Sequence, residues 1–237
     1  MNNLALILSG GSGARMNQDI PKQFLTINER PVIIYTLEAF QRHPEIDAIA
    51  VVCLEGWEKF LWAYAKQFNI TKLKHVVTGG ENRQASSRIG LYELEKHFNP
   101  EDIVLIHDGN RPLVSAEIIS NCILNTRNYG SAIGVLSCTG SVMITEDGFN
   151  SKAQYPRDKI KVGQTPNGFI LGKICDIHRR ALEAGITNSI GSHTLMVELG
   201  ETVRLYYGSE KNIKLTTVED IEIFKSLLEA QKPKWLK

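Results

Sequence analysis

The chain has 237 residues, of which 43% are hydrophobic and 22% are charged, and its formal net charge is +1. A charge so close to neutral gives no general attraction to nucleic acid or to an anionic membrane, so neither is expected as a partner. No apolar run approaches the roughly 20 residues that a membrane-spanning helix needs. The first apolar run leads into a glycine-rich loop rather than an export signal, so we expect a cytoplasmic protein.

Nothing in the sequence divides the chain. A length of 237 residues suits one α/β domain or two small ones, and no repeat, low-complexity run or long linker interrupts the pattern. We therefore expect one domain over residues 1–237. The cysteines have no paired spacing, which is typical of reduced thiols rather than a disulfide set or metal ligands. They are Cys53, Cys122, Cys138 and Cys175.

Apolar runs alternate with helical patterns along the chain. This alternation predicts a Rossmann-like α/β fold, with a mostly parallel sheet and helices on both of its faces. The expected strands are residues 4–8, 48–54, 75–78, 103–107, 132–136 and 203–208. Helical spacing predicts helices within residues 32–40, 60–68, 115–124, 171–184 and 218–228. Residues 138–161 mix short segments with Gly and Pro and are expected to form a protruding arm.

The first expected strand ends in the sequence SGGSGARM at residues 9–16, and PKQFL follows at residues 21–25. Glycines let successive backbone N–H groups converge on an anion, and Arg15 and Lys22 add positive charge nearby. The segment therefore predicts a phosphate site. Its structural alternative is a tight turn between a strand and a helix, because glycine is common in such turns.

Neither standard nucleotide loop matches this segment. The dinucleotide fingerprint needs a third glycine where Met16 stands, and the P-loop needs a lysine directly after its glycine, whereas Lys22 lies nine residues after Gly13. The pattern Gly-x-Gly-x-Arg-Met followed by Pro-Lys-Gln instead resembles the cytidylyltransferases that act on 2-C-methyl-D-erythritol 4-phosphate and ribitol 5-phosphate.

In that family the loop surrounds the triphosphate of CTP, and the fold is of the nucleotide-diphospho-sugar transferase type. The resemblance implies that Arg15 and Lys22 are catalytic. It also implies that the loop binds the nucleotide through Leu8, Ser9, Gly10, Gly11 and Gly13.

A second segment, GGENRQAS at residues 79–86, follows an expected strand and begins a helix, which is where open sheets hold ligands. Taken alone, it would be a turn and a capped helix. The family's Gly-Gly-x-x-Arg-x-x-Ser segment contacts cytosine and ribose, so the resemblance implies nucleotide contacts at Gly80, Glu81 and Ser86. The family often has Asp where Glu81 stands.

A third segment, HDGNRP at residues 107–112, places an acid directly after an apolar strand. Burying a carboxylate is costly unless it is paired or binds a cation, so Asp108 is expected either to pair with Arg111 or to bind Mg²⁺. The family's His-Asp-x-x-Arg-Pro implies that Asp108 contacts the nucleotide and the metal, and that Arg111 contacts the acceptor. His107 is expected to be a hydrogen-bonded core residue.

A fourth segment, NIKLT at residues 212–216, precedes the last expected helix, and its lysine alone would be a solvated charge. In the family this lysine reaches the reacting phosphates, which implies a catalytic role for Lys214. Gln164-Thr165-Pro166 also matches a family segment. Arg157 falls where the family has an arginine that binds the acceptor.

The expected reaction needs no general base. The second pKa of a phosphate ester is about 6, so the acceptor is largely dianionic near neutral pH. Its oxygen would attack the α-phosphorus of CTP in line with departing pyrophosphate, helped by positioning and by cations. Arg15, Lys22, Lys214 and the metal on Asp108 would supply those cations.

The acceptor contacts differ from those usual in the methylerythritol-phosphate enzymes. Residues 139–142, from Thr139 on, stand where those enzymes carry Asp-Thr-x-Lys, and Ile190 and Gly191 stand where they carry Thr-Asp. We expect Thr139 still to contact the acceptor, and we expect ribitol 5-phosphate or a similar polyol phosphate as that acceptor. The alternative acceptor is 2-C-methyl-D-erythritol 4-phosphate.

Two other classes stay open from the residues alone, an NAD-dependent reductase and a non-catalytic partner-binding protein. The first would need the missing third glycine of the dinucleotide fingerprint. The second would have no reason to keep the predicted cations and Asp108 together. The resemblance further implies that the arm makes the protein a homodimer.

Overall fold

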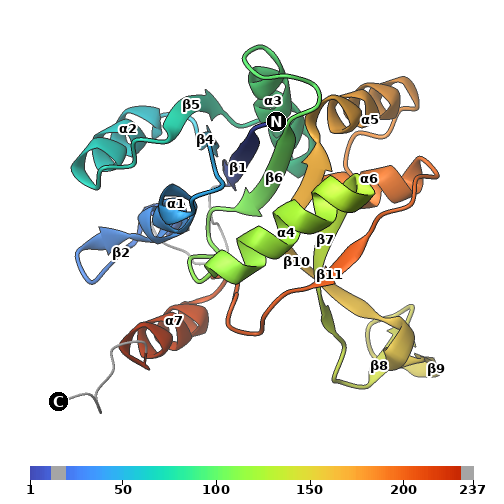
Figure 1. Cartoon of the computed structure of the whole chain (residues 1–237). Coiled ribbons are helices and arrows are strands. Elements are labelled where there is room, and N and C mark those ends of the chain that lie inside the picture. Colours follow the sequence, from blue (N-terminus) through green and yellow to red (C-terminus); the bar gives the residue numbers. More distant parts are fainter. Residues whose placement is uncertain (12–19, 231–237) are drawn as a thin grey trace.

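The computed structural model describes residues 1–11 and 20–230. At its centre is a seven-stranded sheet with the order β11-β7-β10-β6-β1-β4-β5 (Figure 1). Every neighbouring pair in the sheet is parallel except those of β10, which runs antiparallel to both β6 and β7. The predicted mostly parallel sheet is therefore confirmed, with one reversed strand. The strands are β1 (Asn3–Ser9), β4 (Ala48–Cys53), β5 (Leu73–Thr78), β6 (Ile103–Asp108), β7 (Ser131–Ser137), β10 (Lys161–Ile170) and β11 (Leu205–Tyr207).

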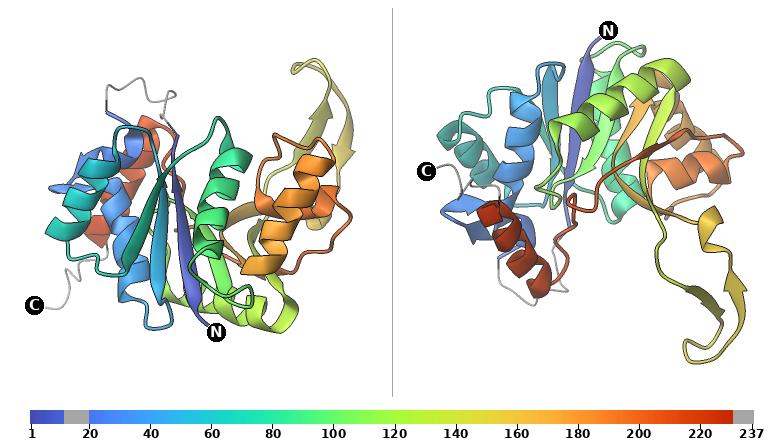
Figure 2. Two further views of the ribbon diagram at one scale, coloured as in Figure 1. Left: turned by 90° about the horizontal axis from the view of Figure 1, so that it is seen from above. Right: turned by 60° about the horizontal axis from the view of Figure 1, so that its bottom comes forward.

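Helices cover both faces of the sheet, as predicted (Figure 2). Alternate residues of each central strand point to opposite faces, so Ile7 of β1 joins one core and Leu6 joins the other. The first core includes α1 (Val32–Arg42), α2 (Glu58–Gln67) and α4 (Ala116–Tyr129). The second includes α3 (Arg83–Glu95), α5 (Leu171–Glu183) and α6 (Ser192–Glu198). Both faces are buried, which explains why the central strands are continuous apolar runs.

Some elements differ from the expected ones, most clearly β10, α6 and α4. Strand β10 was not expected because Gly163 and Pro166 interrupt its pattern, and the pairing of β10 with β7 shifts register between Gly163 and Asn167. Helix α6 was not expected because it is short. Helix α4 begins after Ser115, whose side chain caps it as predicted, but continues past the expected end to the left-handed Gly130.

The predicted arm is present as a protrusion. Strands β8 (Val142–Thr145) and β9 (Ser151–Tyr155) pair antiparallel in a ribbon that extends away from the sheet between β7 and β10 (Figures 1 and 2). The short helix η3 (Arg157–Lys159) leads the chain back to β10. Whether the arm mediates dimerisation stays a prediction, as does the assignment of residues 1–237 to one domain.

A small third core lies beside the sheet. Helix α7 (Val218–Ala230) packs on the start of α1 and on β2 (Thr26–Ile27), which pairs with β3 (Arg30–Pro31). Phe224 is fully buried there, with its ring edge against Tyr35. Among the described helices, none is long and apolar enough to cross a membrane. All four cysteines are free, and only Cys138 is not fully buried.

Candidate active site

A cavity of about 450 Å³ opens where β1 and β6 end, at the edge of the sheet where the loops after the parallel strands meet. This size suits a small-molecule ligand. The cavity brings together predicted residues from all four segments: Leu8, Ser9, Gly10, Gly11, Lys22, Gly80, Glu81, Ser86, Asp108 and Lys214. Other lining residues were not predicted: Gln23, Leu54, Asn82, Arg83 and Asn110.

The two glycine segments approach each other backbone to backbone. A Cβ at Gly79 would lie 3.3 Å from the Cα of Gly10. A Cβ at Gly80 would lie 2.7 Å from the Cβ of Ala85 in the first turn of α3. Only glycine fits at Gly80 without displacing the helix start. Ser86 accepts a hydrogen bond at 3.1 Å from the backbone N–H of Gly80, so its hydroxyl also shapes the loop.

Gln23 holds the described part of the first loop in place. Its side-chain amide donates to the carbonyls of Ser9 at 2.9 Å and Gly11 at 3.0 Å, and the residue is buried. The next residue, Phe24, stacks on Trp57 with ring centroids 4.5 Å apart. These contacts fix the short helix η2 (Lys22–Phe24), which places Lys22 at the cavity wall.

Asp108 is the charged centre of the cavity. Its side chain is only 5% exposed, and it forms ion pairs with Arg83 at 2.7 Å, Lys214 at 2.9 Å and Arg111 at 3.3 Å. Burial alone would raise the pKa of Asp108, but the charges of Arg83, Lys214 and Arg111 outweigh it and lower the pKa well below its usual range. The carboxylate is therefore ionised and gathers three cations.

A chain of buried hydrogen bonds fixes the backbone of Asp108. Thr165 accepts from the backbone N–H of Asp108 at 3.1 Å, and its hydroxyl lies 3.1 Å from Nδ1 of His107. The other ring nitrogen of His107 donates to the carbonyl of Arg111 at 3.1 Å. Burial lowers the pKa of His107 to about 4, so the ring is neutral near pH 7. His107 is thus a hydrogen-bonded core residue, as expected.

The segment that carries Lys214 is fastened to the same loop. Asn110 donates to the carbonyl of Leu215 at 2.6 Å, and the Leu215 N–H returns a bond to the carbonyl of Asn110 at 2.9 Å. Arg111 donates to the carbonyl of Asn212 at 2.8 Å, and the Asn212 side chain donates to the carbonyl of Thr165 at 2.7 Å. Lys214 is thereby brought to Asp108 from a distant part of the sequence.

The donor set around Asp108 bears on the expected Mg²⁺. Arg83 contacts one carboxylate oxygen, while Lys214 and Arg111 share the other. A single carboxylate with three cationic neighbours does not fit a metal that the protein holds by itself. It fits an ion whose ligands come mostly from bound phosphates, which is common for Mg²⁺.

The predicted acceptor residues lie elsewhere. Arg111 is mostly buried in its contacts with Asp108 and Asn212 and does not line the cavity. Arg157 and Thr139 lie in the arm, where Arg157 donates to the carbonyl of Thr139 at 3.2 Å. The structure brings these two together but places neither in the cavity of the same chain.

Two predicted residues, Gly13 and Arg15, lie outside the described residues. Sequence reasoning missed Arg83, although it stands in the second segment. The need of a buried carboxylate for several counter-charges was the available signal.

The chain was compared with families of known proteins. Residues 4–230 match the model of the family described as IspD: 2-C-methyl-D-erythritol 4-phosphate cytidylyltransferase. The chain belongs to this family. The predicted family and its enzyme class, a CTP-dependent nucleotidyltransferase, are therefore confirmed.

Relatives of this IspD-family chain carry two names. A ribitol-5-phosphate cytidylyltransferase of Lacticaseibacillus paracasei is 39% identical, over 94% of this chain and 97% of the relative. Another of Vibrio parahaemolyticus is 41% identical, over 97% of each. A 2-C-methyl-D-erythritol 4-phosphate cytidylyltransferase of Clostridium novyi is 38% identical, over 96% of each.

Solved structures show the same fold. The 4-diphosphocytidyl-2C-methyl-D-erythritol synthase of Anaerococcus prevotii superposes with a TM-score of 0.81 at 27% identity, covering 96% of each chain. The 2-C-methyl-D-erythritol 4-phosphate cytidylyltransferase of Thermus thermophilus gives a TM-score of 0.77 at 27% identity, covering 97% of this chain and all of that one. The IspD-type arrangement therefore extends over nearly the whole chain.

Proposed function

We propose that this protein transfers CMP from CTP to the phosphate of ribitol 5-phosphate and releases pyrophosphate. The observation that carries the proposal is the convergence of Arg83, Arg111 and Lys214 on Asp108 beside the two glycine loops. Such a cluster suits a reaction in which several anions must be held together. Its cations would match the negative charge on the phosphates.

The cavity supplies two kinds of contact to a nucleotide. Backbone approach at Gly10 and Gly80 lets a ligand come close to main-chain N–H groups. Lys22 and Lys214, from near the two ends of the chain, both line the cavity and would contact the phosphates of a bound nucleotide. Lys214 is 36% exposed while it contacts Asp108, so its ammonium group reaches both the carboxylate and the cavity.

Mg²⁺ bound to the triphosphate would add positive charge where the leaving pyrophosphate forms. Asp108 is the residue that would hold it. The remaining steps rest on this chain's own residues. Lys22 and Lys214 would stabilise charge on the α-phosphate, and the loops would keep the nucleotide in line with the attacking phosphate oxygen.

We infer the acceptor from sequence departures and from relatives. Ile190 is 78% exposed and Gly191 has no side chain, so this segment lacks the polar groups usual in the methylerythritol-phosphate enzymes. Relatives named for ribitol 5-phosphate reach 41% identity, against 38% for those named for 2-C-methyl-D-erythritol 4-phosphate. The second acceptor remains the alternative.

A screen of pyrophosphate release tests the function. Purified protein with Mg²⁺ and CTP is offered ribitol 5-phosphate, 2-C-methyl-D-erythritol 4-phosphate and other polyol phosphates. We expect kcat/KM to be about tenfold or more higher for ribitol 5-phosphate, because hydrogen-bonding sites discriminate strongly between hydroxyl patterns. A preference for 2-C-methyl-D-erythritol 4-phosphate would overturn the acceptor assignment.

The same screen separates the other classes. No pyrophosphate release with any acceptor would favour a non-catalytic protein. A thermal shift with NAD but not with CTP and Mg²⁺ would favour a reductase.

We also propose that the protein is a cytoplasmic homodimer whose arm reaches the partner's acceptor pocket. Arg157 and Thr139 support this arrangement, because they contact each other in the arm and do not line the cavity described above. Sedimentation of the full chain should give a dimer. A monomer that is fully active would refute the shared pocket.

A further inference from the structure

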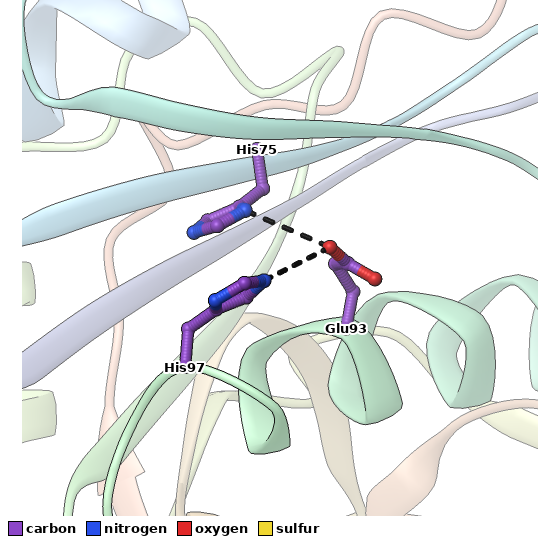
Figure 3. A group of neighbouring side chains, drawn as sticks. All are labelled: His75, Glu93 and His97. Carbon is purple, nitrogen blue, oxygen red and sulfur yellow. Dashed lines mark hydrogen bonds and ion pairs between the residues drawn. The ribbon is translucent and has the colours of Figure 1, made fainter.

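A group of side chains far from the cavity has the composition of a metal site. His75 lies on β5, Glu93 lies in the last turn of α3, and His97 follows that helix (Figure 3). One ligand-type atom from each lies within 4.8 Å of the others. We propose that these three residues bind a divalent transition-metal ion such as Zn²⁺.

The ligand types favour this class of ion. Two imidazole nitrogens and a carboxylate oxygen suit Zn²⁺, Co²⁺, Ni²⁺ or Cu²⁺ better than Mg²⁺ or Ca²⁺, which prefer oxygen ligands. Three protein ligands leave a fourth position for water. Glu93 and His97 are four residues apart, so both face β5 from the end of one helix.

The distances between these side-chain atoms agree with one metal ion bound by all three residues. Nδ1 of His75 and Nε2 of His97 lie 3.7 and 3.3 Å from the same oxygen, Oε1 of Glu93 (Figure 3). The longer distance exceeds a hydrogen bond. Two ligands on a tetrahedral zinc, with bonds of roughly 2.0–2.1 Å, are separated by about 3.4 Å. The measured spacings lie on either side of that value.

The surroundings hold two of the ligands and leave the third adjustable. The His75 side chain is 19% exposed and Glu93 is 22% exposed, and the ring of Phe98 meets His75 edge-on. Lys96 contacts the other carboxylate oxygen of Glu93 at 2.7 Å and orients it. The two imidazoles stack with an angle of 23° between their planes, so a turn of the more exposed His97 ring would direct its nitrogen at the ion.

A bound ion would connect β5 to the end of α3. The beginning of the same helix carries Arg83 and Ser86 at the cavity. The cluster itself does not line that cavity. The proposed ion would therefore stabilise the helix that supports the site without contacting substrates, and the proposal is independent of the reaction assigned above.

The test is a titration of the tag-free, chelator-treated full chain with Zn²⁺ against a chromophoric chelator, without nucleotide. We expect one ion per chain, and affinity about tenfold or more weaker in His97→Ala and in Glu93→Gln. Lys74→Ala is the matched control, because Lys74 is exposed, lies next to His75 on β5 and leaves the three ligands and Lys96 unchanged. Zn²⁺ should raise the Tm of the wild type and the control only.

Co²⁺ offers a second readout, since its visible spectrum distinguishes four-coordinate protein sites from the hydrated ion. His97 is the most exposed of the three ligands, and unfolding curves of both ligand variants without metal show whether they are folded. Equal Zn²⁺ affinity in the wild type, His97→Ala and Glu93→Gln would overturn the proposal, and so would no binding to the wild type.

Discussion

Asp108 gathers the charge of the site, because three cations from three parts of the sequence meet its carboxylate. Two of them, Arg83 and Lys214, are separated by more than half the chain yet share this anchor. Removing one member of a buried charged cluster leaves the others uncompensated. The side chain therefore has a structural role in addition to any contact with a metal.

These two roles predict different results for Asp108→Asn. We expect turnover to fall by about a hundredfold or more, because a neutral amide does not hold Arg83, Arg111 and Lys214 in place by charge. CTP binding should weaken even without Mg²⁺, as measured by calorimetry with and without the metal. If only the Mg²⁺-dependent part of binding changes, Asp108 acts as a metal ligand alone. The exposed Asp176→Asn serves as the charge-matched control.

The two lysines at the cavity should affect rate rather than folding. Lys22→Ala and Lys214→Ala should each lower kcat by about a hundredfold, because each removes a cation from the charge that develops on the α-phosphate. Circular dichroism should stay close to wild type in both variants, because Arg83 and Arg111 still compensate the charge of Asp108 when Lys214 is removed. Lys211→Ala, at an exposed position three residues before Lys214, should leave the rate unchanged. Near-normal turnover in either cavity variant would contradict its catalytic role.

At the scale of elements, β10 packs so closely on α4 that position 168 has no room for a side chain. A Cβ at Gly168 would lie 1.9 Å from Oγ1 of Thr126 and 3.0 Å from Sγ of Cys122, both on α4. Gly168→Ala should therefore destabilise the protein by about 1–3 kcal/mol through overpacking. Urea unfolding measures the change, with Gly140→Ala as a control in open space.

The clash with Thr126 gives this prediction a second test. Thr126→Ala removes the obstructing hydroxyl, so the double variant should be more stable than the sum of the two single effects predicts. Strict additivity would show that Gly168 acts by another route.

The same strand marks the limit of prediction from sequence. Strands β1, β4 and β6 were predictable because both faces of the sheet are covered and their residues are continuously apolar. Strand β10 was not, because Gly163–Pro166 breaks that pattern and the strand is defined by its neighbours rather than by its own composition. The arm between β7 and β10 returns the chain so that β10 runs antiparallel to β7.

The site was predictable to a similar degree. Its loops carry local motifs, so the glycine segments, Asp108 and Lys214 were identified in advance. The partnership of Arg83 with Asp108 was not, because it joins two strand-helix units that only the folded sheet brings together. Gln23 was missed because its role is to hold backbone carbonyls, which leaves no trace in spacing.

At the scale of the whole molecule, buried histidines predict acid sensitivity. Burial lowers the pKa of His107 and of His178 to about 4, below the value of about 6.5 in an unfolded chain. Between these values the unfolded chain binds protons that the native state does not. The contribution of these two rings to the free energy of unfolding is therefore fully present well above pH 6.5. It falls as the pH drops towards 4, by up to about 3 kcal/mol for each residue.

Urea unfolding at several pH values between 7 and 4.5 checks this slope. His178→Gln should make the slope shallower by about one proton, because one of the two groups no longer titrates. A free energy of unfolding that does not change between pH 7 and 5 would show that the buried rings exchange protons as freely as in the unfolded chain.

The fastening of Lys214 by Asn110, Arg111 and Asn212 has a consequence for how the protein is made. The seven strands of the sheet are complete once Tyr207 has left the ribosome, but the lysine and the contacts that hold it follow later. A nascent chain can therefore fold its sheet and form its glycine loops before it has a complete set of cations. The site would be complete only after Lys214 has also emerged, so a nascent chain that ends at Tyr207 would lack this cation.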